Sequence, residues 1–224
     1  MEKAPPLTPF TPAPAHPTSL FVSFEGVEGA GKSTQSEKLK RAMEEAGMEV
    51  SVFREPGGTP FGEGLRASIL KCTNDLSPLA EAYLFASSRA QLLHQEILPR
   101  LQRPKQMVIV DRYYDSSVAY QGLGQGLGPH LIAHIHGRPP LHSMPHLTFY
   151  LDTPLELGLS RMEERGQIKD YFESREKTFF EKIVCGFDWC ARHYPERIVK
   201  IQGDREIQDV GQEIQRLCRD RLHG

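Results

Sequence analysis

Short apolar runs along the chain alternate with longer stretches in which apolar residues recur every three or four positions. Runs of the first kind are typical of buried strands, and spacing of the second kind is typical of one face of a helix. The short runs predict strands at residues 20–24, 48–53, 107–110, 147–151 and 198–201. The longer stretches predict helices at residues 32–46, 78–98, 154–165, 173–193 and 206 to about 222.

This alternation predicts an α/β fold in which a five-stranded parallel sheet carries helices on both faces. Ligands of such sheets bind beyond the carboxyl ends of the strands. Residues 1–18 contain six prolines and few residues that could form a core, so we expect a flexible tail there and one domain over residues 19–224. A polyproline segment that binds a partner is the alternative for the tail.

Composition narrows the class of partner. A net charge of −2 and a pI of about 6.5 leave no basic face of the kind that nucleic-acid binding requires, so we expect small-molecule chemistry. The cysteines show neither a zinc spacing nor a C-x-x-C pair and are expected to be reduced thiols of a cytoplasmic protein. No apolar run approaches the ~18 residues of a membrane span, so we expect no membrane partner.

Candidate chemistry begins directly after the first predicted strand, where the chain reads FEGVEGAGKST. Gly26, Gly31, Lys32 and Ser33 fit the pattern G-x-x-x-x-G-K-[ST], in which backbone N–H groups surround phosphates, the lysine reaches the β and γ groups, and the hydroxyl contacts Mg²⁺. Four fixed positions match by chance in about one chain per hundred of this size. The required context of strand, glycine turn and helix is present, so we expect a phosphate-binding loop.

A carboxylate and an arginine follow the predicted strand at residues 107–110. Asp111 is suited to a Mg²⁺ shell and Arg112 to a phosphate, which its planar fork binds through two hydrogen bonds. An ordinary aspartate at a strand end is the alternative for Asp111. Since carboxyl ends of parallel strands meet at one edge of the sheet, we expect this pair to lie beside the glycine-rich loop.

Two further clusters are weaker signals. Residues 53–66, FREPGGTPFGEGLR, combine glycines with charge, and a loop stabilised by pairing of Arg54 with Glu55 would look similar. Phe85 and Arg89 lie four apart on a predicted helix and could stack on a base and donate to it. A core phenylalanine beside a surface arginine is the alternative.

Two other patterns are assigned no chemistry. Five histidines, at positions 130, 134, 136, 142 and 146, have no recurring acidic ligand and are expected to lie in loops. Residues 121–128, QGLGQGLG, open no obvious helix after a strand, so we expect a mobile connection rather than a second phosphate site.

Taken together, five ordered segments resemble the thymidylate kinase family over residues 20 to about 210. They are FEGVEGAGKST, FREPGGTPFGEGLR, LFASSRAQ, DRYYDSSVAYQGLGQGLG and LTFYLDTPLELGLSRMEERG. The resemblance implies a P-loop nucleoside monophosphate kinase fold and ATP-dependent phosphorylation of thymidine monophosphate to the diphosphate. It also implies Mg²⁺, and usually a homodimer in the cytoplasm.

Matching positions of the family carry roles over to this chain. In ATP binding, Lys32 would stabilise the charge on the transferred group, while Ser33 and Asp111 would hold Mg²⁺. ATP-binding residues implied by the resemblance are Gly26, Val27, Glu28, Gly29, Ala30, Gly31, Lys32, Ser33 and Thr34. The adenine base would meet backbone near residues 202–205.

The resemblance also implies how the acceptor nucleotide binds. Its phosphate would be held by arginines, its base stacked on a phenylalanine and read at the edge by polar side chains, and its 2′ position closed by a tyrosine. Glu28 would face the 3′ hydroxyl or order waters around the metal. The implied residues are Glu28, Glu55, Arg66, Phe85, Arg89, Arg112, Ser117, Tyr120 and Gln121.

One catalytic group departs from the family pattern. Some members carry an arginine in the phosphate loop, where this chain has Gly29, and others supply it from a lid, here expected at residues 162–175. That lid often reads D-R-x-E, but here the tetrapeptide at 170–173 is DYFE, without the arginine. We hypothesise that Arg161 and Arg165 carry the role, with Arg175 as a displaced substitute.

Three other functions are alternatives. A P-loop switch protein generally carries N-K-x-D and D-x-x-G, and this chain contains neither. A kinase for guanylate, uridylate or a broader set of pyrimidines would need only one altered contact in the base pocket. A degenerate relative that binds partners through the tail would need loss of phosphate-site residues, but Lys32, Ser33, Asp111 and Arg112 are all present.

Overall fold

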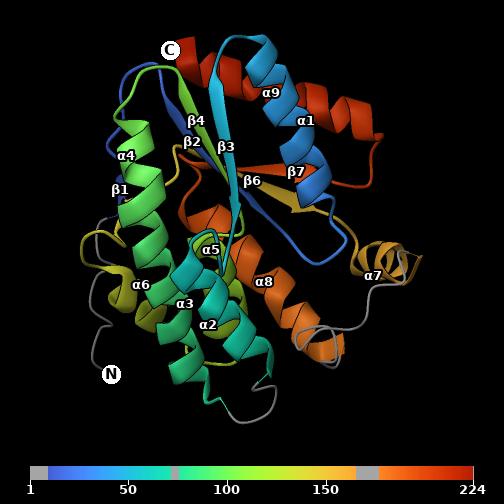
Figure 1. Ribbon diagram of the computed structural model, residues 1–224. Coiled ribbons are helices and arrows are strands. Elements are labelled where there is room, and N and C mark those ends of the chain that lie inside the picture. Colours follow the sequence, from blue (N-terminus) through green and yellow to red (C-terminus); the bar gives the residue numbers. More distant parts are fainter. Residues whose placement is uncertain (1–9, 72–75, 165–176, 224) are drawn as a thin grey trace.

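A five-stranded parallel sheet forms the centre of the protein (Figure 1), and its strand order is β3-β4-β2-β6-β7. The computed structural model describes residues 10–71, 76–164 and 177–223. The strands are β2 (Leu20–Glu25), β3 (Glu49–Arg54), β4 (Gln106–Asp111), β6 (Leu147–Asp152) and β7 (Ile198–Gln202), and every pairing between them is parallel. The predicted fold is confirmed, and each predicted strand is present within one or two residues.

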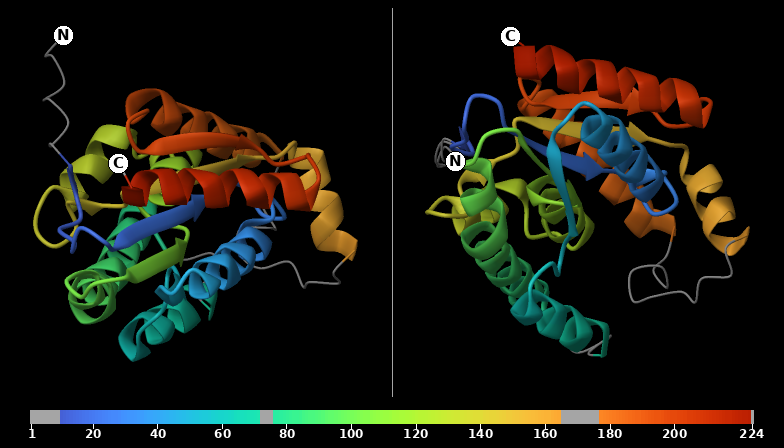
Figure 2. Two further views of the ribbon diagram at one scale, coloured as in Figure 1. Left: turned by 90° about the horizontal axis from the view of Figure 1, so that it is seen from above. Right: turned by 45° about the horizontal axis from the view of Figure 1, so that its top comes forward.

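Helices cover both faces of this sheet (Figures 1 and 2). Helices α1 and α9 pack together on one face, while α8 and the π-helix η2 pack together on the other. The long described helices are α1 (Lys32–Glu45), α2 (Pro60–Lys71), α3 (Pro78–Leu92), α6 (Pro129–His136), α7 (Leu155–Glu164), α8 (Lys177–His193) and α9 (Ile207–His223). Shorter pieces are η1 (Leu93–Ile97), α4 (Leu98–Leu101), α5 (Tyr114–Ser117) and η2 (Val118–Gly124).

Burial explains why the sequences of the central strands are almost unbroken runs of apolar residues. All six residues of β2 are buried, as are the first five of β4, because helices exclude water from both of their faces. Strand β3 lies at the edge of the sheet, and all of its residues are exposed or half-buried. The central strands therefore form the core, and their carboxyl ends all point to one edge.

Part of the expected flexible tail is packed against the domain. Residues Thr11–Pro12 form strand β1, which pairs with β5 (Ser143–Met144) in a separate two-stranded sheet. The ring of Phe10 lies 4.7 Å from that of Tyr114, and Ala13 is 2% exposed. For residues 10–18 the prediction of a flexible tail was wrong, because proline tolerates the edge of a short sheet and Phe10 contributes apolar contact. Residues 1–9 lie outside the described chain.

The glycine-rich stretch at residues 121–128 is only in part a connection between helices, whereas we predicted a mobile connection throughout. Its first part belongs to the π-helix η2, and Gln121 and Gly122 are buried there. A Cβ atom on Gly186 of α8 would lie 2.5 Å from the Cα atom of Ala119, and one on Gly124 would lie 2.8 Å from the Phe179 ring. Glycine at position 186 therefore lets α8 approach the backbone of η2, and glycine at position 124 leaves space for the Phe179 ring.

Histidines also depart from the prediction, since three of the five lie on helix α6 rather than in loops. Among them His136 is 1% exposed. Within the described ranges, no group of three or more histidine, cysteine or acidic side chains could hold a metal ion. In the same ranges Cys185, Cys190 and Cys218 are free, and no helix is both long and apolar enough to cross a membrane.

Candidate active site

The glycine-rich loop lies between β2 and α1, as the motif predicts. Gly26, Gly29 and Gly31 have φ angles of 138°, 70° and 96°, a region that other residues adopt only with strain. Lys32 begins α1, and its Nζ donates to the carbonyl oxygens of Gly26 at 3.1 Å and Val27 at 2.8 Å. Burial, together with the nearby Arg112, lowers the pKa of Lys32 to about 8. The loop therefore curls around its own lysine.

Ser33 and Asp111 meet across the edge of the sheet. The Ser33 hydroxyl donates to Oδ2 of Asp111 at 3.1 Å, and the other carboxylate oxygen, Oδ1, is buried and lacks a hydrogen-bond partner among the described residues. A hydroxyl and an unpartnered carboxylate oxygen are the hard oxygen ligands that Mg²⁺ prefers. The donor set therefore fits that ion.

Arg112 connects the loop to the opposite wall of the site. Its φ of 69° is unusual for a residue with a side chain, and its N–H donates to the Phe24 carbonyl at 2.9 Å. The guanidinium donates to Glu28 Oε1 at 2.9 Å, to the Gly26 carbonyl at 3.1 Å and to Ser116 Oγ at 3.2 Å. Strained backbone at such a position is characteristic of functional sites.

The charge of Glu28 is stabilised by its neighbours. Burial disfavours its charged form, but Arg112 and Lys32 outweigh burial and lower the pKa of the Glu28 carboxyl. The Tyr120 hydroxyl donates to the same oxygen, Oε1, at 2.7 Å, and the Arg112 guanidinium lies 5.0 Å from the centre of the Tyr120 ring. Its second oxygen, Oε2, is buried without a hydrogen-bond partner in the described chain. Glu28 thus orients both an arginine and a tyrosine.

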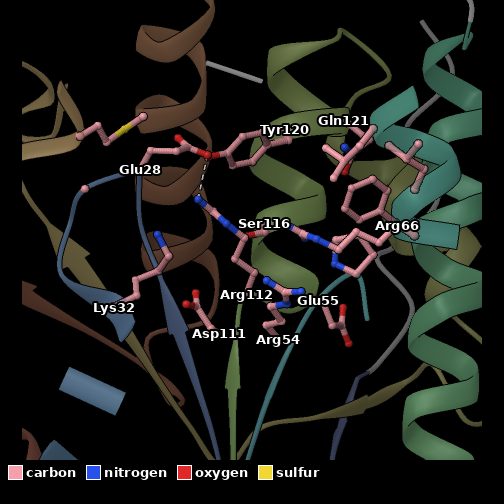
Figure 3. A pocket seen from close by; sticks show the side chains of 16 residues that line it. Glu28, Lys32, Arg54, Glu55, Arg66, Asp111, Arg112, Ser116, Tyr120 and Gln121 are labelled. Atoms are coloured by element: carbon pink, nitrogen blue, oxygen red, sulfur yellow. Dashed lines mark hydrogen bonds and ion pairs between the residues drawn. The ribbon is translucent and has the colours of Figure 1, made fainter. Parts of the chain in front are cut away.

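A cavity of about 280 Å³ opens beside these groups (Figure 3). Lys32 and Asp111 lie at one end, and Gln121 lies at the other. Predicted site residues that line the cavity are Glu28, Gly29, Lys32, Glu55, Arg66, Phe85, Asp111, Arg112, Tyr120 and Gln121. The walls between its ends are partly apolar, with Pro56, Ile69, Leu70 and Met162.

The second glycine cluster shapes one wall of this cavity. A cis peptide joins Glu55 to Pro56, and the following residues, Gly57 and Gly58, have positive φ angles of 143° and 77°. The Gly58 N–H donates to Glu63 Oε1 at 3.0 Å. Helix α2 then starts at Pro60, a residue suited to a first helical position. This turn places the Glu55 side chain at the cavity. Arg66, which lies further along α2, lines the same cavity.

Arg89 lies behind the cavity wall. It is 1% exposed and pairs with Glu55 through Nε at 2.7 Å and Nη2 at 2.6 Å. Its Nη1 donates to Ser117 Oγ at 3.0 Å and to His136 Nε2 at 2.6 Å. Neither Arg89 nor Ser117 lines the cavity, so their predicted contacts with a base stay predictions. The alternative of a surface arginine is wrong.

His136 is a neutral acceptor in this network. Arginine only donates, so Nε2 must accept from it, and Nδ1 therefore carries the proton that is donated to the Ile132 carbonyl at 2.8 Å. Burial and the positive charge of Arg89 lower the pKa of His136 to about 3. This residue was missed at the level of sequence, because only the fold brings it to Arg89.

A second buried group that was missed lies beneath Arg112. Glu25 is fully buried and accepts from the Tyr113 N–H at 2.7 Å and from the Ser116 hydroxyl at 2.5 Å. Burial, with the nearby charge of Asp115, raises the pKa of Glu25 to about 7. Asp115 itself receives two hydrogen bonds of 2.7 Å from Arg197. The available signal was an acidic residue at the end of a buried apolar run.

The predicted lid falls mainly outside the described residues. Arg165, Arg175 and the tetrapeptide at 170–173 lie there, and their role stays a prediction. Arg161 is described on α7, and its Nη1 donates to the Gly29 carbonyl at 3.4 Å. A smaller cavity of about 80 Å³ lies beside the loop, lined by Thr34, Arg161, Gly203 and Arg205 among others. It adjoins the stretch expected to meet adenine.

Comparison with known proteins assigns the family. The family model described as thymidylate kinase matches residues 24–214. The chain is 38% identical over 209 residues to a thymidylate kinase of Citrifermentans bemidjiense, covering 91% of this chain and 92% of that protein. It is 41% identical over 203 residues to one of Chlorobaculum tepidum, covering 87% of this chain and 94% of that protein.

A solved structure agrees with this assignment. The crystal structure of thymidylate kinase from Ehrlichia chaffeensis superimposes with a TM-score of 0.70 and 30% identity, over 90% of this chain and 98% of that one. Both the sequence and the fold thus match along nearly the whole length of these relatives. The chain belongs to the thymidylate kinase family.

Proposed function

We propose that the protein transfers the γ-phosphate of ATP to thymidine monophosphate, forming thymidine diphosphate and ADP. The observation that carries this proposal is the arrangement in one cavity of Lys32 with its glycine loop at one end and Gln121 at the other. A triphosphate bound by the loop would face an acceptor nucleotide bound in the cavity. The family to which the chain belongs supports the choice of thymidylate.

Phosphate binding would use groups that now bond within the loop. The Lys32 ammonium donates to two loop carbonyls at 3.1 and 2.8 Å, and a bound triphosphate would offer it more strongly charged acceptors. Ser33 and Asp111 would hold Mg²⁺, which when bound neutralises charge on the phosphates. The loop N–H groups and the start of α1 would bind the remaining oxygens.

Transfer requires no general base from the protein, because the acceptor phosphate is already an anionic nucleophile. The main barrier is repulsion between two polyanions that must meet in line. Arg112, Arg66 and Lys32 all line the cavity. The two arginines would hold the acceptor phosphate, and the lysine would stabilise charge on the transferred group. Arg161, close to the loop at Gly29, is the described candidate for a further cation.

Nucleoside recognition would use the opposite end of the cavity. Phe85 offers a ring face for stacking, and Gln121 offers an amide for the base edge. The Tyr120 hydroxyl, held by Glu28 at 2.7 Å, would leave a ribose 2′ hydroxyl without space or partner and so favour deoxynucleotides. The small cavity beside Gly203 and Arg205 would receive the adenine of ATP.

A coupled assay of ADP release with a panel of nucleoside monophosphates tests this proposal. We expect thymidine monophosphate to exceed the uridine, cytidine and guanosine forms in kcat/KM, with turnover dependent on Mg²⁺. Comparable rates with several pyrimidine forms would instead indicate a broader pyrimidine kinase. Absence of turnover with every member of the panel would refute a kinase function.

Assembly and location are separate expectations. The family resemblance supports a homodimer in the cytoplasm, and light scattering at micromolar concentration would test the first of these. A mass of one chain, 25.3 kDa, would contradict it.

A further inference from the structure

A buried carboxylate that the proposed chemistry does not use lies directly behind Gln121. Glu81, in the first turn of α3, is 0% exposed. Its Oε1 accepts from Nε2 of Gln121 at 2.7 Å and from Nε2 of Gln125 at 2.8 Å. Its other oxygen, Oε2, has no hydrogen-bond partner among the described residues. A buried acidic group with two amide donors needs an explanation beyond packing.

This contact fixes which way the Gln121 amide points. A glutamine presents an NH₂ donor on one side and a carbonyl acceptor on the other, and a carboxylate can only accept. Glu81 therefore holds the NH₂ group of Gln121, so the amide cannot rotate by half a turn without setting oxygen against oxygen. The carbonyl oxygen is consequently the polar atom that Gln121 has left for a ligand.

Two observations agree with that conclusion. The Gln121 carbonyl oxygen, Oε1, is buried and has no hydrogen-bond partner in the described chain. Gln121 also lines the cavity, at the end away from Lys32 (Figure 3). An acceptor that is buried without a partner costs stability, and a ligand that supplies a donor there recovers that cost. Gln121 thus offers its carbonyl oxygen, and not its NH₂ group, to a ligand in this cavity.

We propose that Glu81 is a positioning residue that makes Gln121 an acceptor for a ring N–H of the base, and so selects pyrimidines with an imide edge over cytosine. The inference rests on the proposed function and adds the polarity of the base contact. Thymine and uracil carry a proton on N3, whereas cytosine has a lone pair at that position. Cytosine would therefore set its lone pair against the Gln121 carbonyl, and this contact is repulsive.

Replacement of Glu81 by glutamine tests the proposal, because it keeps the shape but can donate as well as accept. Either orientation of Gln121 then finds a partner at position 81. We expect the ratio of kcat/KM for dUMP over dCMP to fall at least tenfold, mainly through KM. The ratio for dTMP over dUMP should change less than about twofold, since those bases differ only in a methyl group remote from N3.

A matched control comes from the second donor. Gln125→Ala removes one hydrogen bond to Glu81 but leaves the 2.7 Å contact with Gln121, so the dUMP to dCMP ratio should stay that of the unmodified enzyme. If Glu81 were merely structural, Glu81→Gln would lower kcat/KM for all three substrates in parallel. An unchanged dUMP to dCMP ratio in a folded Glu81→Gln enzyme therefore overturns the proposal.

A second measurement uses the unmodified enzyme, so it does not depend on whether a variant folds. Calorimetry would compare dTMP with its N3-methyl analogue, which lacks the ring N–H, on the unmodified enzyme. We expect the analogue to bind at least tenfold more weakly, and equal affinities would overturn the proposal. Failure of the proposed function is distinguishable, because an enzyme that phosphorylates no nucleotide would give no turnover with dTMP at all.

Discussion

The two ends of the cavity are built by different means. At the phosphate end the chain uses backbone and charged side chains, because the glycine loop curls around Lys32, Ser33 donates to Asp111 and Arg112 donates to Glu28. At the base end, buried polar side chains hold one another, as Glu81 holds Gln121 and His136 holds Arg89. A phosphate needs charge and N–H groups, whereas a base edge needs donors and acceptors in fixed order.

The difference predicts what substitution should do at each end. A change at the phosphate end removes charge from the transition state and should act on kcat with little effect on folding. A change at the base end disturbs a buried network and should act on selectivity, stability or both. The following experiments are ordered by the size of the expected effect.

Lys32→Met should have the largest effect. Methionine has a side chain of similar length to lysine but lacks the charge that would stabilise the transferred phosphate. We therefore expect kcat to fall about 10³-fold. Thermal unfolding of the unliganded variant should move little, because burial already disfavours the lysine charge and lowers its pKa to about 8. A kinase assay and a melting curve measure the two quantities. A loss of activity that tracked a loss of folding would contradict the separation of roles.

Arg112→Lys should come next, with a loss of about 10²-fold in kcat/KM for dTMP. Lysine keeps the charge but cannot reproduce a fork that bonds Glu28, Gly26 and Ser116 together. We expect both a higher KM for dTMP and a lower kcat, measured under saturating ATP. Activity within threefold of the unmodified enzyme would mean that a point charge is sufficient there.

His136→Gln should change how stability depends on pH rather than how the enzyme turns over. The folded pKa of His136 is about 3, below the usual 6.5, so the unfolded chain binds a proton that the folded chain does not. Stability from this group is therefore fully present above pH 6.5 and is lost as pH falls toward 3. From pH 7 to pH 4.5, the free energy of unfolding should therefore fall by about 2–3 kcal/mol more in the unmodified protein than in the His136→Gln variant.

Urea unfolding at those two pH values measures this difference. His94→Gln, at an exposed histidine of η1, is the matched control and should leave the pH dependence unchanged. Identical pH dependence in the His136→Gln and unmodified proteins would show that His136 takes up its proton without cost when folded.

Tyr120→Phe should have the smallest effect and acts between the two ends. It removes the 2.7 Å hydrogen bond to Glu28 and the hydroxyl near the expected sugar. We expect the preference for deoxy over ribo substrates to fall about tenfold, while kcat for dTMP stays within about threefold. Kinetics with dTMP and its ribonucleotide provide the ratio. If the ratio of deoxy to ribo activity does not change, the Tyr120 hydroxyl does not select the sugar.

The phosphate end was predictable because its signal is local. Gly26, Gly31, Lys32 and Ser33 lie within eight positions, and the strand before them and the helix after them both have clear apolar periods. The loop conformation follows from the glycines themselves, whose positive φ angles the residue type suggests. Asp111 and Arg112 were located by the same reasoning, from the end of an apolar run.

The base end was only partly predictable because its partners are far apart in sequence. Glu81 is 40 positions from Gln121, and Arg89 is 47 from His136, so no local pattern joins them. The π-helix that carries Gln121 depends on contact between η2 and α8, which glycine-rich sequence alone cannot indicate. Composition likewise suggested flexibility for residues 10–18, where Phe10 and a two-residue strand decide the packing.

The close packing of Gly29 against Gly158 limits which substitutions this chain can accept at these two positions. A Cβ atom on Gly29 would lie 2.1 Å from the carbonyl oxygen of Gly158, and one on Gly158 would lie 2.6 Å from that of Glu28. An arginine introduced at Gly29 would therefore collide with the first turns of α7 unless that helix moved as well. This chain could therefore not acquire an arginine in the loop through a single substitution without a compensating change in α7.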